Sequence, residues 1–81
     1  MSNEDQLRKC FREALALPSD TNIDSISYQA NPLWDSVGHM RLVAAIETTF
    51  NIMFTTDQIL DMSSFKKAGE LVGQHGVSLE S

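Results

Sequence analysis

The chain has 81 residues, which is long enough for one small domain with a modest core. Its formal net charge is −5. This acidic balance argues against nucleic-acid binding, which needs clustered Lys and Arg side chains, and favours basic protein partners. A single cysteine excludes an internal disulfide bond, and no apolar run is long enough to span a membrane. The N-terminal residues lack the apolar core of a secretion signal. We therefore expect a cytoplasmic protein, and we expect it to be a monomer.

A first amphipathic helix is predicted over residues 4–17. Its apolar residues recur at helical spacing and should face the core: Leu7, Cys10, Phe11 and Ala14. Ser2 or Asn3 can cap its start, and Pro18 should end it. Because Cys10 lies on the apolar stripe, we expect a buried structural thiol and not a thioester carrier.

A long polar connection follows over residues 18–33. Ile23 and Ile26 should fix this segment to the core, because a loop of this length in a small domain must either pack or function. We expect coil with no more than one turn of helix. Trp34 ends the segment, and its expected role is a partly buried anchor.

The longest predicted helix begins after Asn31-Pro32-Leu33 and ends near Phe50. Asp35 or Ser36 should cap it, because a short side-chain oxygen can accept from the first backbone N–H groups. The predicted core face consists of His39, Val43, Ile46 and Phe50, with Met40 and Leu42 on its flanks. A second stripe should be largely exposed, and it comprises Val37, Arg41, Ala44 and Thr48. Spacing alone leaves open whether that stripe is a docking surface or the shoulder of the core.

The remaining chain predicts two further helices. Asn51 suits a left-handed exit, and the next three residues, Ile52, Met53 and Phe54, should cover the end of the core. A short helix over 57–61 should be capped by Thr55 or Thr56 and turn Ile59 and Leu60 inward. A last helix, capped by Ser63 or Ser64, should bury Phe65, Ala68, Leu71 and Val72 and fray at Gly73 and Gly76. The prediction is a single all-α domain, a small four-helix bundle with an ordered core over about residues 4–73 and a loose tail at 77–81.

Little in the sequence supports catalysis or metal binding. His39, His75 and Cys10 lack metal-ligand spacing. Asp35, Ser36 and His39 supply the residue types of a serine hydrolase, but neighbouring helical positions do not aim them at one another, and no Gly-x-Ser-x-Gly elbow surrounds the serine. His39 is expected at the edge of the core, with its ring bonded to backbone or water. We therefore expect no enzyme, and Ser36 is either a simple cap or a site that accepts a phosphate-linked group.

The segment Asp35-Ser36-Val37, followed by Leu42-Val43 and Ile46-Glu47 and ending at Phe50, resembles the acyl carrier protein family. The other predicted helices also fall where a carrier domain has its four helices, so the resemblance covers about residues 4–73. It implies that Ser36 carries 4′-phosphopantetheine, added from coenzyme A by a phosphopantetheinyl transferase, with Asp35 in a supporting role. Acyl groups would then travel as thioesters on the thiol of this arm, between acyl-loading and synthase enzymes.

The resemblance also implies a partner face on the second helix, which would comprise Val37, Arg41, Ala44, Glu47 and Thr48. These positions are less acidic than in the carriers of bacterial fatty-acid synthesis, so docking should be more apolar. Fatty-acid, polyketide or related specialised biosynthesis are the implied settings. A peptidyl or aminoacyl carrier, including a D-alanyl carrier, remains an alternative, as does an unmodified helical interaction module.

Overall fold

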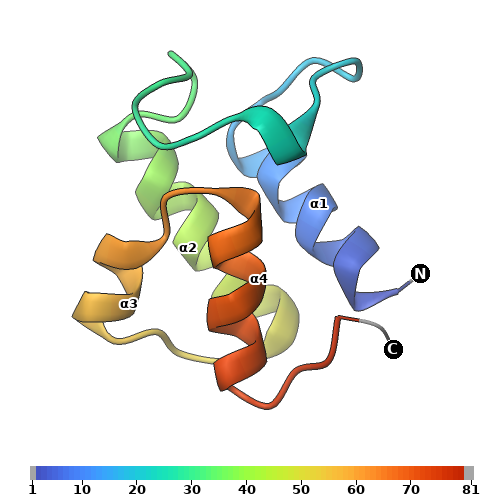
Figure 1. The fold of residues 1–81 in the computed structure, drawn as a ribbon, viewed down its shortest axis with the longest axis vertical. Helices are drawn as coiled ribbons and strands as arrows, with labels where there is room; N and C mark the ends of the chain where they lie inside the picture. The colour runs from blue at the N-terminus through green and yellow to red at the C-terminus, as the bar shows by residue number, and fades with distance from the viewer. Residues whose placement is uncertain (1, 80–81) are drawn as a thin grey trace.

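Four α-helices and one 3-10 turn organise residues 2–79, the part of the chain that this computed structural model describes (Figure 1). In chain order the elements are α1 (Asn3–Ala14), η1 (Ile23–Ser25), α2 (Ser36–Phe50), α3 (Thr56–Asp61) and α4 (Phe65–Gln74). Across these residues the only β pairing is an isolated antiparallel bridge between Ser27 and Ser64. The predicted all-α fold with a long first connection and a short third helix is confirmed.

The core lies where α1, α2 and α4 meet, with α4 in front of α2 in Figure 1 and with α1 and α3 on opposite sides. Phe11 of α1 lies at the centre of the aromatic packing. Its ring meets Trp34 edge-on at 5.2 Å between centroids and meets Phe65 of α4 at 5.3 Å. Such pairs contribute about 0.5–1.5 kcal/mol each beyond their buried area, so one side chain joins three segments.

Most of the predicted core residues are buried in the structure. The apolar stripes of α1, α2 and α4 are confirmed at Leu7, Cys10, Phe11, Leu42, Val43, Ile46, Phe65, Ala68, Leu71 and Val72. Both predicted anchors of the long connection, Ile23 and Ile26, are buried, and the single turn expected there is η1. Trp34 differs from its prediction, because it is completely buried and not partly so.

Each α-helix begins at a short polar side chain that caps the first turn. Ser2, Asp35, Thr55 and Ser64 each accept a hydrogen bond from a backbone N–H two or three residues into their helix. Thr55 also forms a reciprocal capping box with Gln58. Caps of this kind are each worth about 0.5–2 kcal/mol, which explains why such short helices have defined starts. The left-handed exit at Asn51 is likewise confirmed, with φ of 55°.

The predicted end of the first helix is wrong, since α1 stops at Ala14 and does not reach Leu17. Ala16 adopts a left-handed conformation, and the chain turns there so that Leu15 and Leu17 both enter the core. Arg12 stabilises this turn, because its side chain donates to the Pro18 carbonyl oxygen at 2.8 Å. Tertiary burial of two leucines therefore ends the helix before Pro18 would.

Three apolar residues expected at or beside the core are exposed. Met53 and Leu60 expose 79% and 74% of their surface, and Met40 is also mostly outside. Beside the first two, Phe54 is buried, and Ile59 is half-buried and packs against the core. The predictions for Met53 and Leu60 are therefore wrong, whereas Met40 lies on the exposed side of the flank predicted for it.

The tail contacts α1 and α4 over its described residues. The Asn3 side chain donates to the Ser78 carbonyl oxygen at 2.7 Å, and the Glu4 N–H donates to the Leu79 carbonyl oxygen at 3.3 Å. Leu79 also packs over Gly69 of α4, where a side chain would meet it. The loose tail expected from residue 77 stays a prediction, and residues 80–81 lie outside the described part of the chain.

The two helical glycines Gly38 and Gly73 should respond in opposite ways to an added methyl group. Gly38→Ala should lower the free energy of unfolding by about 1–3 kcal/mol, because its Cβ would lie 2.7 Å from the Leu33 carbonyl oxygen and 2.9 Å from Leu15 Cδ2. Nothing lies within 4 Å of a Cβ at Gly73, so Gly73→Ala should raise that free energy by about 0.4–1 kcal/mol. Urea denaturation followed by circular dichroism measures both. Equal stability of the two variants would contradict the close packing at Gly38.

Candidate functional site

Ser36 is the first residue of α2, and its side chain is exposed. Of the two predicted caps, the structure uses Asp35, whose Oδ1 accepts from the Gly38 N–H at 2.8 Å. Because Asp35 performs the capping, the Ser36 hydroxyl is not needed for it. Ser36 therefore offers a solvent-facing oxygen that takes no part in the capping of its own helix.

The electrostatics of this helix end suit an added anion. The N–H groups of Ser36 and Val37 precede the first intrahelical donor, the His39 N–H, which bonds to the Asp35 carbonyl oxygen, and so they have no partner within α2. The helix dipole places a partial positive charge at the same end, which stabilises a nearby anion by about 0.3–1 kcal/mol. Asp35 already contributes one negative charge here, and its carboxylate is directed to Gly38. The residues present therefore fit an exposed phosphate ester on Ser36.

Tyr28 is the side chain that meets the Ser36 hydroxyl, and no sequence pattern pointed to it. Its phenolic oxygen lies 3.3 Å from Ser36 Oγ. The ring is half-buried and lies against the His39 imidazole, with centroids 4.6 Å apart and planes inclined at 35°. Tyr28 precedes Ser36 by eight positions in an irregular segment, so only the folded path of the chain brings them together.

His39 is buried beneath this pair, and both of its ring nitrogens are engaged. Nδ1 accepts from the Trp34 indole N–H at 2.9 Å, and Nε2 lies 2.8 Å from the Ile59 carbonyl oxygen. An indole can only donate and a carbonyl can only accept, so the proton of a neutral imidazole resides on Nε2. The expected position at the core edge with a backbone hydrogen bond is confirmed, whereas the bond from Trp34 was not foreseen.

The engagement of His39 bears on a hydrolase mechanism. Its two nitrogens face Trp34 and Ile59, so neither faces Ser36. A serine nucleophile activated by a neighbouring histidine needs that contact. Among residues 2–79 there is also no group of three His, Cys, Asp or Glu side chains placed to hold a metal ion.

The second stripe of α2 is exposed as predicted. Val37, Arg41, Ala44 and Thr48 all face outward, and the exposed Met40 lies between the first two in sequence. Glu47 differs from the expectation of an exposed position, because it is half-buried and its Oε2 accepts from the Phe54 N–H at 2.9 Å. Glu47 therefore stabilises the connection between α2 and α3, and it is less accessible than the rest of the proposed face.

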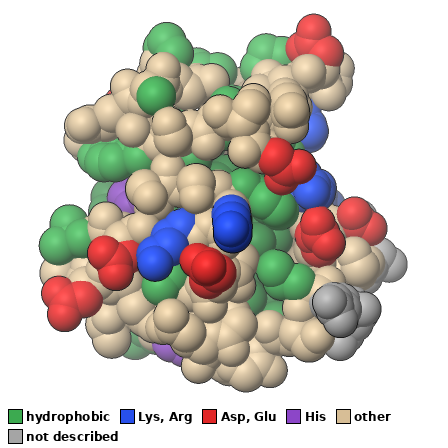
Figure 2. Space-filling view, viewed as in Figure 1, with side chains coloured by type: hydrophobic (Ala, Val, Ile, Leu, Met, Phe, Trp, Pro, Cys, Tyr) green, Lys and Arg blue, Asp and Glu red, His purple; other side chains and the backbone are tan. Residues whose placement is uncertain are grey.

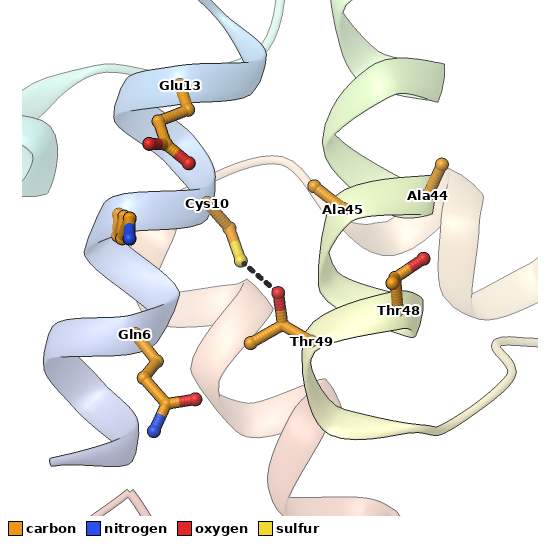
Figure 3. A pocket seen from close by; sticks show the side chains of 8 residues that line it. Gln6, Cys10, Glu13, Ala44, Ala45, Thr48 and Thr49 are labelled. Atoms are coloured by element: carbon orange, nitrogen blue, oxygen red, sulfur yellow. Dashed lines mark hydrogen bonds between the residues drawn. The ribbon is translucent and has the colours of Figure 1, made fainter. Parts of the chain in front are cut away.

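Cys10 lies in a groove between α1 and α2, opposite Thr49 (Figure 3). Its thiol donates to the Thr49 hydroxyl oxygen with a separation of 3.3 Å. Burial raises the pKa of the Cys10 thiol, since desolvation disfavours the thiolate, and a hydrogen bond from the Thr49 hydroxyl to the thiolate offsets only part of that effect. The predicted buried thiol is confirmed.

The face shown in Figure 2 carries Lys, Arg, Asp and Glu side chains intermingled, with no continuous basic surface. No helix described in the structure is long and apolar enough to cross a membrane. Comparisons with protein-family models, with curated proteins and with solved structures give no match. A functional assignment therefore depends on the geometry around Ser36 and on the sequence pattern of α2.

The bond between Trp34 and His39 should be measurable as a coupling energy. His39→Leu should lower the free energy of unfolding by about 1–3 kcal/mol, because the indole N–H and the Ile59 carbonyl then lose a buried partner. A double-mutant cycle with Trp34→Phe should give a coupling of about 0.5–3 kcal/mol by urea denaturation. Strictly additive effects would show that the two side chains do not depend on each other.

Proposed function

We propose that this chain is a carrier protein that holds acyl intermediates as thioesters on a 4′-phosphopantetheine arm attached to Ser36. The observation that carries the proposal lies at the start of α2, where Asp35 caps the helix and the Ser36 hydroxyl is therefore exposed and not needed as a cap. A phosphopantetheinyl transferase would supply the arm from coenzyme A. In this proposal the chain is not an enzyme, and its cargo belongs to fatty-acid, polyketide or related specialised biosynthesis.

Each residue at the site has a defined part in this proposal. Ser36 Oγ would form the phosphate ester, and the outward N–H groups of Ser36 and Val37 would favour its negative charge. Asp35 would keep the first turn of α2 in place and support recognition by the transferase. The arm supplies a flexible thiol, which Cys10 cannot replace because it is buried.

The arrangement of elements supports a fold of the acyl carrier type. A long connection with one turn separates α1 from α2, α3 is short, and α4 packs across the core. The serine at the start of α2 follows directly on that long connection, which agrees with the resemblance of residues 35–50 to the carrier signature.

The exposed stripe of α2 is the proposed partner face. Val37, Met40 and Ala44 offer apolar contact area, whereas Arg41 is its one cation and Glu47 is partly withdrawn. Acyl-loading and synthase enzymes would therefore recognise this face through apolar contact more than through acidic charge.

Two other functions remain candidates. An aminoacyl or peptidyl carrier, including a D-alanyl carrier, would use the same arm on Ser36 and differ only in cargo. An unmodified interaction module is favoured by the exposed apolar side chains Met40, Met53 and Leu60, which in ordinary small domains are more often buried.

Intact-mass measurement after incubation with coenzyme A and a transferase of broad range tests the proposal. The wild-type chain should gain the mass of one phosphopantetheinyl group, and Ser36→Ala should gain none. Ser63→Ala, at another exposed serine, is the matched control and should be modified like wild type. Because Asp35 is the cap, Ser36→Ala should change the free energy of unfolding by no more than about 0.5 kcal/mol. A wild-type chain that stays unmodified would favour the interaction module.

Apolar docking can be separated from electrostatic docking on α2. Val37→Asp should lower kcat/KM for acylation of the arm by an acyl-loading enzyme by about fivefold or more, because it places a charge in an apolar contact. Arg41→Glu should have a smaller effect, and both variants should melt like wild type because both positions are exposed. A larger loss with Arg41→Glu, together with strong salt dependence, would indicate electrostatic docking instead.

A further inference from the structure

The hydroxyl of Tyr28 is the one side-chain group recorded within hydrogen-bonding reach of Ser36 Oγ in residues 2–79. At 3.3 Å, this contact is longer than the usual 2.7–2.8 Å of an O–H···O bond. Tyr28 can therefore bias the direction of the Ser36 hydroxyl without withdrawing it from a reaction.

The Tyr28 ring is held from several directions, although its hydroxyl reaches solvent. Its backbone N–H donates to the Ser63 carbonyl oxygen at 3.0 Å, next to the start of α4. Its ring lies on the His39 imidazole, and the Trp34 ring is 6.3 Å away on centroids. Hydrogen bonds to Trp34 and Ile59 fix the His39 ring in turn. The Tyr28 phenol therefore reaches Ser36 from a ring that packs on a fixed neighbour.

We propose that Tyr28 is a positioning residue for the modification of Ser36, an inference that rests on the proposed carrier function. Transfer joins Ser36 Oγ to the pantetheine-bearing phosphorus of coenzyme A and breaks the bond from that phosphorus to the bridging pyrophosphate oxygen. Adenosine 3′,5′-bisphosphate leaves with the electron pair, and the Ser36 proton passes to the transferase. Tyr28 exchanges no proton in this step, and it only orients Oγ.

A phenol can interact with Ser36 both before and after the transfer, because its hydroxyl can accept or donate a hydrogen bond. Before transfer, the Tyr28 oxygen can accept from the Ser36 hydroxyl and direct the Oγ lone pairs outward. After transfer, Oγ carries no hydrogen, and the Tyr28 O–H becomes a donor available to the anionic phosphate ester. Hydrogen bonds to charged groups are stronger than neutral ones, so the hydroxyl should also restrict the base of the arm.

Tyr28→Phe separates the hydroxyl from the ring, because it keeps the stacking on His39. With a transferase of broad range and coenzyme A, it should lower kcat/KM by about two- to tenfold, mainly through kcat, as expected for one lost hydrogen bond. Its thermal midpoint should equal that of wild type. The phosphorus-31 resonance of the loaded variant should be displaced from that of loaded wild type. Ser19→Ala, at an exposed serine in the turn after α1, is the control and should match wild type in all three measurements.

The outcomes distinguish this inference from the function on which it rests. Wild type and Tyr28→Phe could both accept the phosphopantetheine arm at the same rate and give the same phosphorus-31 resonance. The role of Tyr28 is then overturned and the carrier proposal stands. If neither chain loads, both proposals are overturned. A slower Tyr28→Phe with a lowered thermal midpoint would assign the hydroxyl to structure and would also overturn the inference.

Discussion

The hydrogen bond from the buried Trp34 indole to His39 Nδ1 is the interaction on which the rest of the fold depends. Trp34 ends the long connection, His39 belongs to the first turns of α2, and the other nitrogen of His39 bonds to Ile59 in α3. One imidazole therefore joins the long connection, α2 and α3 through buried polar contacts. Its two partners satisfy both ring nitrogens, and these hydrogen bonds offset the desolvation cost of burying a polar ring in a small core.

The surface chemistry around Ser36 follows from this buried arrangement. Trp34 packs edge-on against Phe11 and so connects the bonded pair to α1. On the solvent side, the same imidazole supports the Tyr28 ring, which reaches the Ser36 hydroxyl. Asp35 follows Trp34 directly and caps α2. The proposed attachment point is therefore exposed, but the groups that surround it are held by the core.

Local patterns in the sequence predicted much of the fold. Apolar spacing identified the buried faces of α1, α2 and α4, and short polar residues identified all four N-terminal caps, although two residues competed for each. The wrong predictions concern helix ends and buried side chains that are decided by tertiary packing, which local sequence patterns do not describe. Leu15 and Leu17 are buried where α1 ends early, and Ile59 packs against the core whereas Leu60 is exposed. At the candidate site, Asp35 and Ser36 were predictable from helix capping, whereas Tyr28 comes from a loop without periodicity and could be found only in the folded chain.

The burial of Cys10 has a practical consequence for labelling chemistry. The chain has no other cysteine, and this one is buried with a raised pKa, so alkylating reagents should react with it slowly at neutral pH. A pantetheine sulfhydryl on Ser36 would stand in solvent and react quickly. Maleimide dyes would therefore tag the prosthetic arm selectively on the native polypeptide, with no need to remove the endogenous cysteine first.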